Sequence, residues 1–102
     1  MSSGLMRVAV AGGDPKPLTS PDLVKDEIHH GFPELLPDGR TVLFTIATGD
    51  GSHIAKLSLD SGEWEELLPY GAGPRYLSAG YLVFSEKGNL RLVRFDLRVL
   101  ST

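Results

Sequence analysis

Apolar residues along this chain occur in short runs, and residues with turn propensity separate one run from the next. The clearest run covers residues 41–47 and combines Val, Leu, Phe, Ile and Thr, residue types that favour β-strands. The separating segments contain Pro-Asp-Gly, Asp-Gly and Asp-Ser-Gly, which favour tight turns between antiparallel strands. We therefore predict an all-β fold with strands at residues 5–10, 16–19, 32–36, 41–47, 54–59, 64–68, 75–77, 81–85 and 90–95.

Helix signals are confined to one place in the sequence. Ser20 can cap a helix N-terminus, Pro21 suits the first helical position, and acidic residues follow. So short a helix needs support from packing, because its own hydrogen bonds do not offset the cost of nucleation. We predict at most one short helix, around residues 21–28.

Two segments of the chain are copies of one pattern. Residues 32–45 and residues 75–85 each contain an aromatic residue, a turn with glycine, and an apolar run that ends in Phe and a hydroxyl residue. The apolar runs 42–44 and 82–84 lie 40 residues apart, within the range for one repeated blade of a β-propeller. Such a unit is not stable alone, because it must stack on neighbouring units to bury its apolar faces.

The predicted strands group into units when they are counted from the inside of a blade outward. Residues 5–19 supply half a blade, residues 32–68 a full blade, and residues 74–96 a partial blade. We therefore predict one domain over residues 1–102, with about two four-stranded antiparallel β-propeller blades. This is an incomplete propeller, since closure typically needs about four to eight blades. Within the full blade, Gly39 is predicted to take a positive φ in a tight turn.

Composition and charge exclude several classes of function. The net charge is -3, and the scattered basic residues do not form the footprint of a nucleic-acid or anionic-membrane surface. The absence of cysteine excludes disulfides and thiolate metal sites. The apolar runs are far shorter than the roughly 20 residues that span a bilayer. We therefore predict no nucleic-acid partner and no membrane insertion by this segment.

The motifs of the full blade carry a family resemblance. The Pro-Asp-Gly-Arg turn at residues 37–40 resembles that of WD40-like propeller repeats of the TolB or PD40 type. The longer string at residues 30–45 is similar to the propeller in the C-terminal region of bacterial serine/threonine kinases of the eukaryotic type. Ser-Gly-Glu at residues 61–63, Arg-Tyr at residues 75–76 and the segment 88–96 share this likeness, which covers nearly the whole chain.

The resemblance implies a non-catalytic propeller segment, which in that family is attached to a kinase on the far side of a membrane helix. This chain has no His-Arg-Asp, no Asp-Phe-Gly and no glycine-rich phosphate loop, so kinase activity does not carry over. The implied location is extracytoplasmic if the chain is part of such a receptor-type kinase, and cytoplasmic otherwise.

Four residues depart from the family pattern. Gly31 and Phe32 stand where a basic residue and Trp are common. Leu92 and Arg94 stand where smaller or turn-favouring residues are usual. We therefore expect the last strand to face a changed partner.

Histidines are the most obvious candidates for chemistry. His29 and His30 are adjacent, so on a strand their side chains point to opposite faces and do not converge on one metal ion, even with His53 as a third ligand. We predict no metal site and no cofactor. His30 is expected to hydrogen-bond a neighbouring backbone group at the start of an inner strand. The glycine-rich segment 71–74 precedes no predicted helix and is expected to be an inter-blade turn rather than a phosphate loop.

The best binding candidates lie in the second copy of the repeat. Arg75 and Tyr76 begin its innermost predicted strand, near the axis where propellers bind ligands. Together with His30 they are the predicted ligand-binding residues. We predict no enzyme, because no serine lies in Gly-x-Ser-x-Gly and no His and Asp are placed to suggest a triad. Trp64, on an outer strand, is expected to cover the edge of its blade.

Three functions fit these observations. The first is a binding or sensor module without activity of its own, whose partner is another copy of the chain or another protein. The second is a structural repeat protein that assembles with itself. The third is an accessory propeller of a hydrolase or peptidase, and the missing nucleophile motif disfavours it. Because open strand edges pair with other chains, we predict a homo-oligomer whose subunits continue one another's sheets.

Overall fold

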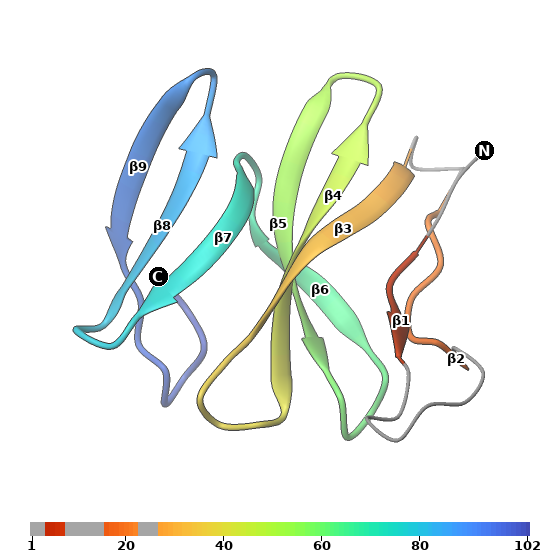
Figure 1. The fold of residues 1–102 in the computed structure, drawn as a ribbon, viewed down its shortest axis with the longest axis horizontal. Helices are drawn as coiled ribbons and strands as arrows, with labels where there is room; N and C mark the ends of the chain where they lie inside the picture. The colour runs from red at the N-terminus through yellow and green to blue at the C-terminus, as the bar shows by residue number, and fades with distance from the viewer. Residues whose placement is uncertain (1–3, 8–15, 23–26) are drawn as a thin grey trace.

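The computed structural model describes residues 4–7, 16–22 and 27–102, and this part of the chain contains strands and connections but no helix. The strands are β1 (Met6–Arg7), β2 (Lys16–Pro17), β3 (Glu27–Leu35), β4 (Thr41–Thr48), β5 (Gly51–Ser58), β6 (Trp64–Leu68), β7 (Ala72–Leu77), β8 (Tyr81–Glu86) and β9 (Asn89–Arg94). They form three antiparallel sheets, β1–β2, β3–β4–β5–β6 and β7–β8–β9, which lie side by side in Figure 1. The all-β prediction is confirmed, and the open sheets are consistent with an incomplete propeller.

The helix predicted around residues 21–28 does not reach its expected end. Residues 23–26 lie outside the described residues, but Glu27 and Ile28 belong to β3. Glu27 pairs with Thr48 of β4, and its side chain is buried. Pairing with β4 therefore extends further toward the N-terminus than the sequence indicated.

An irregularity hides the true length of β3. This strand begins at Glu27 instead of at residue 32, and its register with β4 shifts across Phe32, which has a φ of 51°. A bulge breaks the alternation of inward and outward side chains, so the segment does not show the period of two that identifies a strand. For the same reason β7 begins at Ala72, because its register with β8 shifts between Ala72 and Arg75.

The turn between β3 and β4 confirms the prediction for Gly39, whose φ is 71°. Its N–H donates to the Leu36 carbonyl at 3.0 Å. The Asp38 carboxylate accepts hydrogen bonds from the N–H groups of Arg40 (2.9 Å) and Thr41 (3.0 Å) and from the Thr41 hydroxyl (2.8 Å). Partial burial raises the pKa of Asp38, but these hydrogen bonds to the charged form outweigh it and hold the pKa below its ordinary value.

In the β3–β6 sheet, called the complete sheet below, the central strands β4 and β5 are covered on both faces. Alternate residues of β4 point to opposite sides, as strand geometry requires. Val42 and Phe44 join a buried cluster with Leu5, which precedes β1. Leu43 joins a second buried cluster with Phe84 of β8. The β1–β2 unit therefore covers one face and the β7–β9 sheet covers the other.

The β7–β9 sheet, called the open sheet below, is covered on one face only. Phe84 points inward and is buried against the complete sheet. Three leucines pair with residues of β8 that alternate with the buried Phe84, so these leucines lie on the other face. They are Leu77, Leu90 and Leu92, which are 42%, 78% and 57% exposed. Among the described strands, β9 pairs with β8 alone. The open sheet therefore has both an uncovered apolar face and an unpaired edge.

Candidate functional site

The least exposed polar side chain in the described part of the chain is the imidazole of His30 on β3. Its Nδ1 lies 2.7 Å from the Thr19 hydroxyl oxygen, and its Nε2 lies 2.9 Å from Oε1 of Glu27. The Thr19 hydroxyl also accepts a hydrogen bond from the Leu5 N–H (2.8 Å), and Glu27 Oε1 accepts one from the Asp22 N–H (2.9 Å). His30 therefore ties the segment before β1 and the segment after β2 to the complete sheet. Its partners are two side chains, not the backbone group that the sequence suggested.

The hydrogen-bond network of His30 is satisfied by one ring proton, placed on Nε2. A hydroxyl has one proton and two lone pairs, so Thr19 can accept from the Leu5 N–H and still donate its proton to Nδ1 of His30. The ring proton then lies on Nε2 and is donated to the Glu27 carboxylate. The tautomer is assigned from this network.

A hydroxyl, an imidazole and a carboxylate in this order also form the catalytic group of many hydrolases. Three observations argue against that role here. Thr19, His30 and Glu27 are 5%, 2% and 6% exposed, so no substrate carbonyl reaches the hydroxyl. The Thr19 oxygen is already occupied by the Leu5 N–H. The His30 ring is packed between Phe44 and Trp64, at centroid distances of 5.2 and 5.7 Å. The geometry fits a buried structural clamp.

Sequence reasoning missed Thr19 and Glu27 as partners of His30. On a regular strand, residues three apart point to opposite faces, so Glu27 and His30 were not expected to meet. The register shift between Glu27 and His29 brings them onto the same side. Thr19 is distant in sequence and no local pattern connects it to His30. Trp64 packs against His30 and Phe44, which is the covering role that the sequence suggested for it.

A cavity of about 590 Å³ opens beside His30, between the β1–β2 unit and the complete sheet. Its walls are mostly apolar and include Leu5, Met6, Pro33, Leu35 and Val42. Met6 and Leu35 are more than half exposed, so the cavity is open to solvent. Its chemistry suits an apolar segment or ligand, with no charged side chain in the lining to orient it.

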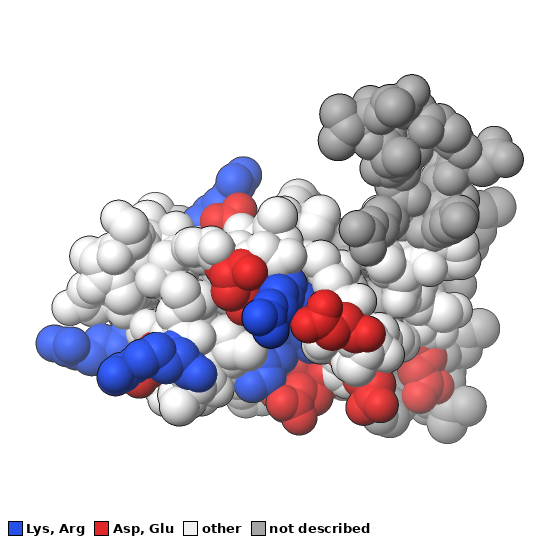
Figure 2. All heavy atoms as spheres, turned by 90° about the horizontal axis from the view of Figure 1, so that it is seen from below, with Lys and Arg blue, Asp and Glu red and all other residues white. Residues whose placement is uncertain are grey.

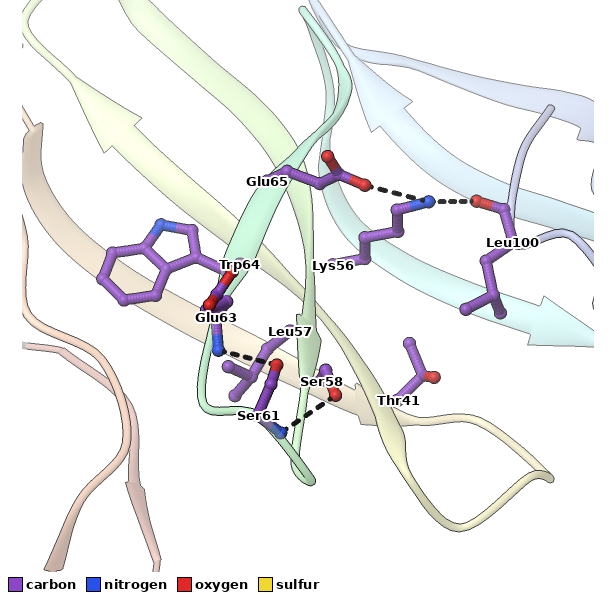
Figure 3. Close-up of a pocket in the computed structure, with 9 residues that line it drawn as sticks. All are labelled: Thr41, Lys56, Leu57, Ser58, Ser61, Glu63, Trp64, Glu65 and Leu100. Carbon is purple, nitrogen blue, oxygen red and sulfur yellow. Dashed lines mark hydrogen bonds and ion pairs between the residues drawn. The ribbon is translucent and has the colours of Figure 1, made fainter.

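A smaller cavity of about 310 Å³ lies where the turn at residues 97–100, which follows β9, meets β5 and β6. Figure 3 shows Lys56 extending between Glu65 and Leu100 in this cavity. Its Nζ donates to the Leu100 carbonyl at 2.7 Å and lies 3.4 Å from Oε1 of Glu65. The hydroxyls of Ser58 and Ser61 accept hydrogen bonds within the adjoining turn. The only cation in the lining is therefore matched by two oxygens, which leaves little attraction for an anionic ligand.

Arg75 and Tyr76, the other predicted binding residues, connect two sheets. The Tyr76 N–H donates to Oε2 of Glu34 at 3.1 Å, and Nη1 of Arg75 lies 3.5 Å from Oε1 of the same carboxylate. The Tyr76 ring packs edge-on against Phe95 with a centroid distance of 6.1 Å. The Arg75 side chain is 74% exposed. These residues adjoin the buried cluster between the two larger sheets, whereas His30 belongs to the opposite face of the complete sheet. The three predicted residues do not form one site.

Searches for known relatives add no assignment, because no family model, curated protein or solved structure matches this chain. Within the described residues, no group of three or more His, Cys, Asp and Glu side chains is placed to hold a metal ion. This part of the chain also contains no helix of the length and hydropathy needed to cross a membrane.

Proposed function

We propose that this chain is a non-catalytic binding module of the β-propeller type, which associates with polypeptides, first of all with copies of itself. The observation that carries the proposal is the contrast between its two larger sheets. The central strands β4 and β5 of the complete sheet are covered on both faces, whereas the open sheet has an uncovered face with exposed leucines and has no fourth strand beside β9. Surfaces of this kind favour contact with another chain.

The packing of the repeated units supports the propeller-type arrangement. Val42 and Phe44 correspond to Leu82 and Phe84 in the 40-residue repeat. In both units these residues face the unit that precedes them in the chain. Each unit therefore uses the same face to pack on its predecessor, as successive blades of a propeller do. By the same rule, the outer face of the open sheet is where a following blade would pack.

The two ends of the described chain differ in a way that supports self-association. The first sheet has two short strands with a cavity beside it, and the last sheet has an uncovered outer face. In a head-to-tail assembly the outer face of one copy would contact the first unit of the next copy. Contacts between two different surfaces are heterologous, and they close into rings or continue as filaments.

Light scattering coupled to size-exclusion chromatography tests this proposal on the full chain. We expect a mass above the monomer value of 11.0 kDa that rises with concentration. Leu77→Asp with Leu92→Asp places charge on the uncovered face and should return the mass to that of a monomer. Ser61→Asp, on an exposed turn of the complete sheet, is the control and should leave the mass unchanged. A stable monomer at micromolar concentration that unfolds cooperatively would contradict the proposal.

A further inference from the structure

The edge of the open sheet has a sequence suited to one kind of strand. We define the β9 edge as Leu90, Arg91, Leu92 and Arg94, all of which are exposed. In an antiparallel pair, every second residue directs its N–H and C=O away from the partner strand. β9 therefore presents both backbone groups and side chains to an incoming strand.

The complete sheet shows how the equivalent edge is filled. In the complete sheet Phe44 lies opposite Ala55 of β5, and in the open sheet Phe84 lies opposite Arg91 of β9. Since Phe44 and Phe84 are equivalent in the repeat, Arg91 takes the place of Ala55. One residue earlier in each strand, Leu90 takes the place of Ile54. Ile54 is fully buried beneath its neighbours, whereas Leu90 is 78% exposed.

The strand that fills this edge in the complete sheet is β6, whose segment reads Glu-Trp-Glu-Glu-Leu-Leu at residues 63–68. β6 places Glu66 opposite Ala55 and Leu68 opposite Ile54. Just before β6 begins, the Glu63 carbonyl accepts the N–H of Ser58 at 2.9 Å.

Transferred to the open sheet, the same strand would place acidic residues at both arginines of the β9 edge. Because Ser58 corresponds to Arg94, the residue in the position of Glu63 would lie beside Arg94. The residue in the position of Glu66 would lie opposite Arg91. The residue in the position of Leu68 would cover Leu90. Two carboxylates and one leucine would thus meet two guanidinium groups and one exposed leucine.

The charge distribution agrees with this arrangement. Residues 27–71 contain two basic and eight acidic residues, whereas residues 72–102 contain five basic and two acidic residues. Figure 2 shows basic side chains toward the end of the molecule that carries the open sheet and most acidic ones toward the other end. Opposite charge of this kind steers encounter and selects the partner.

The arginines retain donors for a new partner. Nη1 of Arg91 lies 2.6 Å from Oε1 of Glu86, and its guanidinium lies over the Tyr70 ring at 5.5 Å. A guanidinium has five N–H donors, so one exposed ion pair leaves others free for a second carboxylate. The Arg94 guanidinium lies over the Tyr81 ring at 5.6 Å, which holds it at the β9 edge.

We propose that the β9 edge binds an acidic extended strand of another polypeptide, with carboxylates at Arg91 and Arg94 and an apolar residue on Leu90. Main-chain hydrogen bonds would supply affinity and these side chains would select the sequence, as in other cases of strand addition. The inference rests on the proposed binding function and names the chemistry of the partner.

A labelled peptide with the sequence of residues 61–70 is the probe, and fluorescence anisotropy with the full chain is the measurement. We expect saturable binding that weakens as salt rises from about 0.05 to 0.5 M, because the contact is electrostatic. Arg91→Glu with Arg94→Glu should weaken binding at least tenfold. Arg98→Glu, an exposed cation outside β9, should change it less than twofold. A peptide with its three glutamates replaced by lysine should not bind the natural chain but should bind the charge-reversed variant.

Several results would overturn the inference. These are no binding at millimolar peptide, equal binding by the double variant that circular dichroism shows to be folded, or equal binding of the lysine peptide to the natural chain. If the double variant does not fold, Arg94→Glu alone provides the same comparison, with a smaller loss expected. Light scattering separates this inference from the proposed function. An oligomer that persists while the peptide fails to bind would contradict only strand addition, and a monomer that binds the peptide would contradict only self-association.

Discussion

The complete sheet and the open sheet are built from one repeated pattern, yet equivalent positions in them differ in burial. Ile54 of the complete sheet is fully buried, and Leu90 at the equivalent position of the open sheet is 78% exposed. The residue types have nearly the same hydrophobicity, so the difference comes from the neighbours. β6 and the open sheet cover Ile54, whereas neither a fourth strand nor a further sheet covers Leu90. Burial in this architecture is thus a property of stacking as much as of sequence.

The largest expected effect on stability compares truncation of a buried side chain in the complete sheet with truncation of an exposed one in the open sheet. Ile54→Ala removes a fully buried side chain from the complete sheet and should lower the free energy of unfolding by about 2–5 kcal/mol. Leu90→Ala is the matched change in the open sheet and should cost less than about 0.5 kcal/mol, because the side chain is already exposed. Urea unfolding of both variants measures the difference. Equal losses would mean that the open sheet is covered in solution.

A second prediction concerns Gly71, which connects the two sheets. Its φ is 102°, and a Cβ there would lie 2.6 Å from Cδ2 of Phe84 and 3.1 Å from Cδ1 of Ile54. Gly71→Ala combines backbone strain with overpacking and should cost about 2–4 kcal/mol. Gly73→Ala is the control, because Gly73 also has a positive φ (64°) but no atom within 4 Å of the added Cβ. Its cost should be about 1 kcal/mol. Similar losses in the two variants would show that the sheets separate easily at this junction.

The third prediction tests the cover on the far face of the complete sheet. Thr19→Val leaves Nδ1 of His30 and the Leu5 N–H without their partner, and should cost about 1–3 kcal/mol. Thr19→Ser keeps the hydroxyl and should cost clearly less. Fluorescence of Trp64, the only tryptophan, reports on this region because its ring packs against His30. An unchanged melting curve for Thr19→Val would show that the hydrogen bonds of the Thr19 hydroxyl do not stabilise the fold.

The smallest expected effect is a pH dependence of stability, and it compares two turns that share one type of backbone hydrogen bond. Gly39 and Gly80 each donate to the carbonyl three residues earlier, at 3.0 and 2.9 Å, but only the first turn has an aspartate, Asp38, where the second has Ala79. The hydrogen bonds lower the pKa of Asp38, so its ionised form is favoured in the folded state. This contribution is present above the ordinary pKa of the group and is lost as pH falls through the lowered value.

Unfolding measured at about pH 7 and about pH 3 tests this contribution. The natural chain should lose slightly more stability on acidification than Asp38→Asn does, because the variant has no carboxylate to protonate. Ala79→Asp, at the equivalent turn, should gain a similar small pH dependence. Identical pH profiles for the natural chain and Asp38→Asn would show that the carboxylate does not stabilise the turn.

Local patterns predicted the regular strands and the tight turn. Residues 41–47 have a composition that fits β4, and the Pro-Asp-Gly motif requires the positive φ found at Gly39. The first half of β3 was missed because His, His and Gly are weak signals for a strand and Phe32 interrupts the alternation. Bulges of this kind depend on pairing with the next strand and leave little trace in one segment.

The candidate sites were predictable only where a residue departed from the family pattern used in the sequence analysis. Leu92 and Arg94 were unusual for the family that the chain resembles, and both lie on the exposed strand β9. The partners of His30 could not be predicted, because Thr19 approaches it only through the packing of the first sheet. Arg75 and Tyr76 contact Glu34 of the neighbouring sheet, which the sequence did not indicate, and their ligand-binding role stays a prediction.

The order in which the sheets pack has a consequence for how the molecule unfolds. The described sheets contact one another in chain order, with the complete sheet between its two neighbours. A molecule of this kind behaves as a one-dimensional array, whose stability is a sum of unit and nearest-neighbour terms. Opening should begin at the ends, so amide hydrogens of β4 and β5 should exchange with solvent more slowly than those of β8 and β9. An added unit at the C-terminal end would then slow exchange in β8 and β9 first.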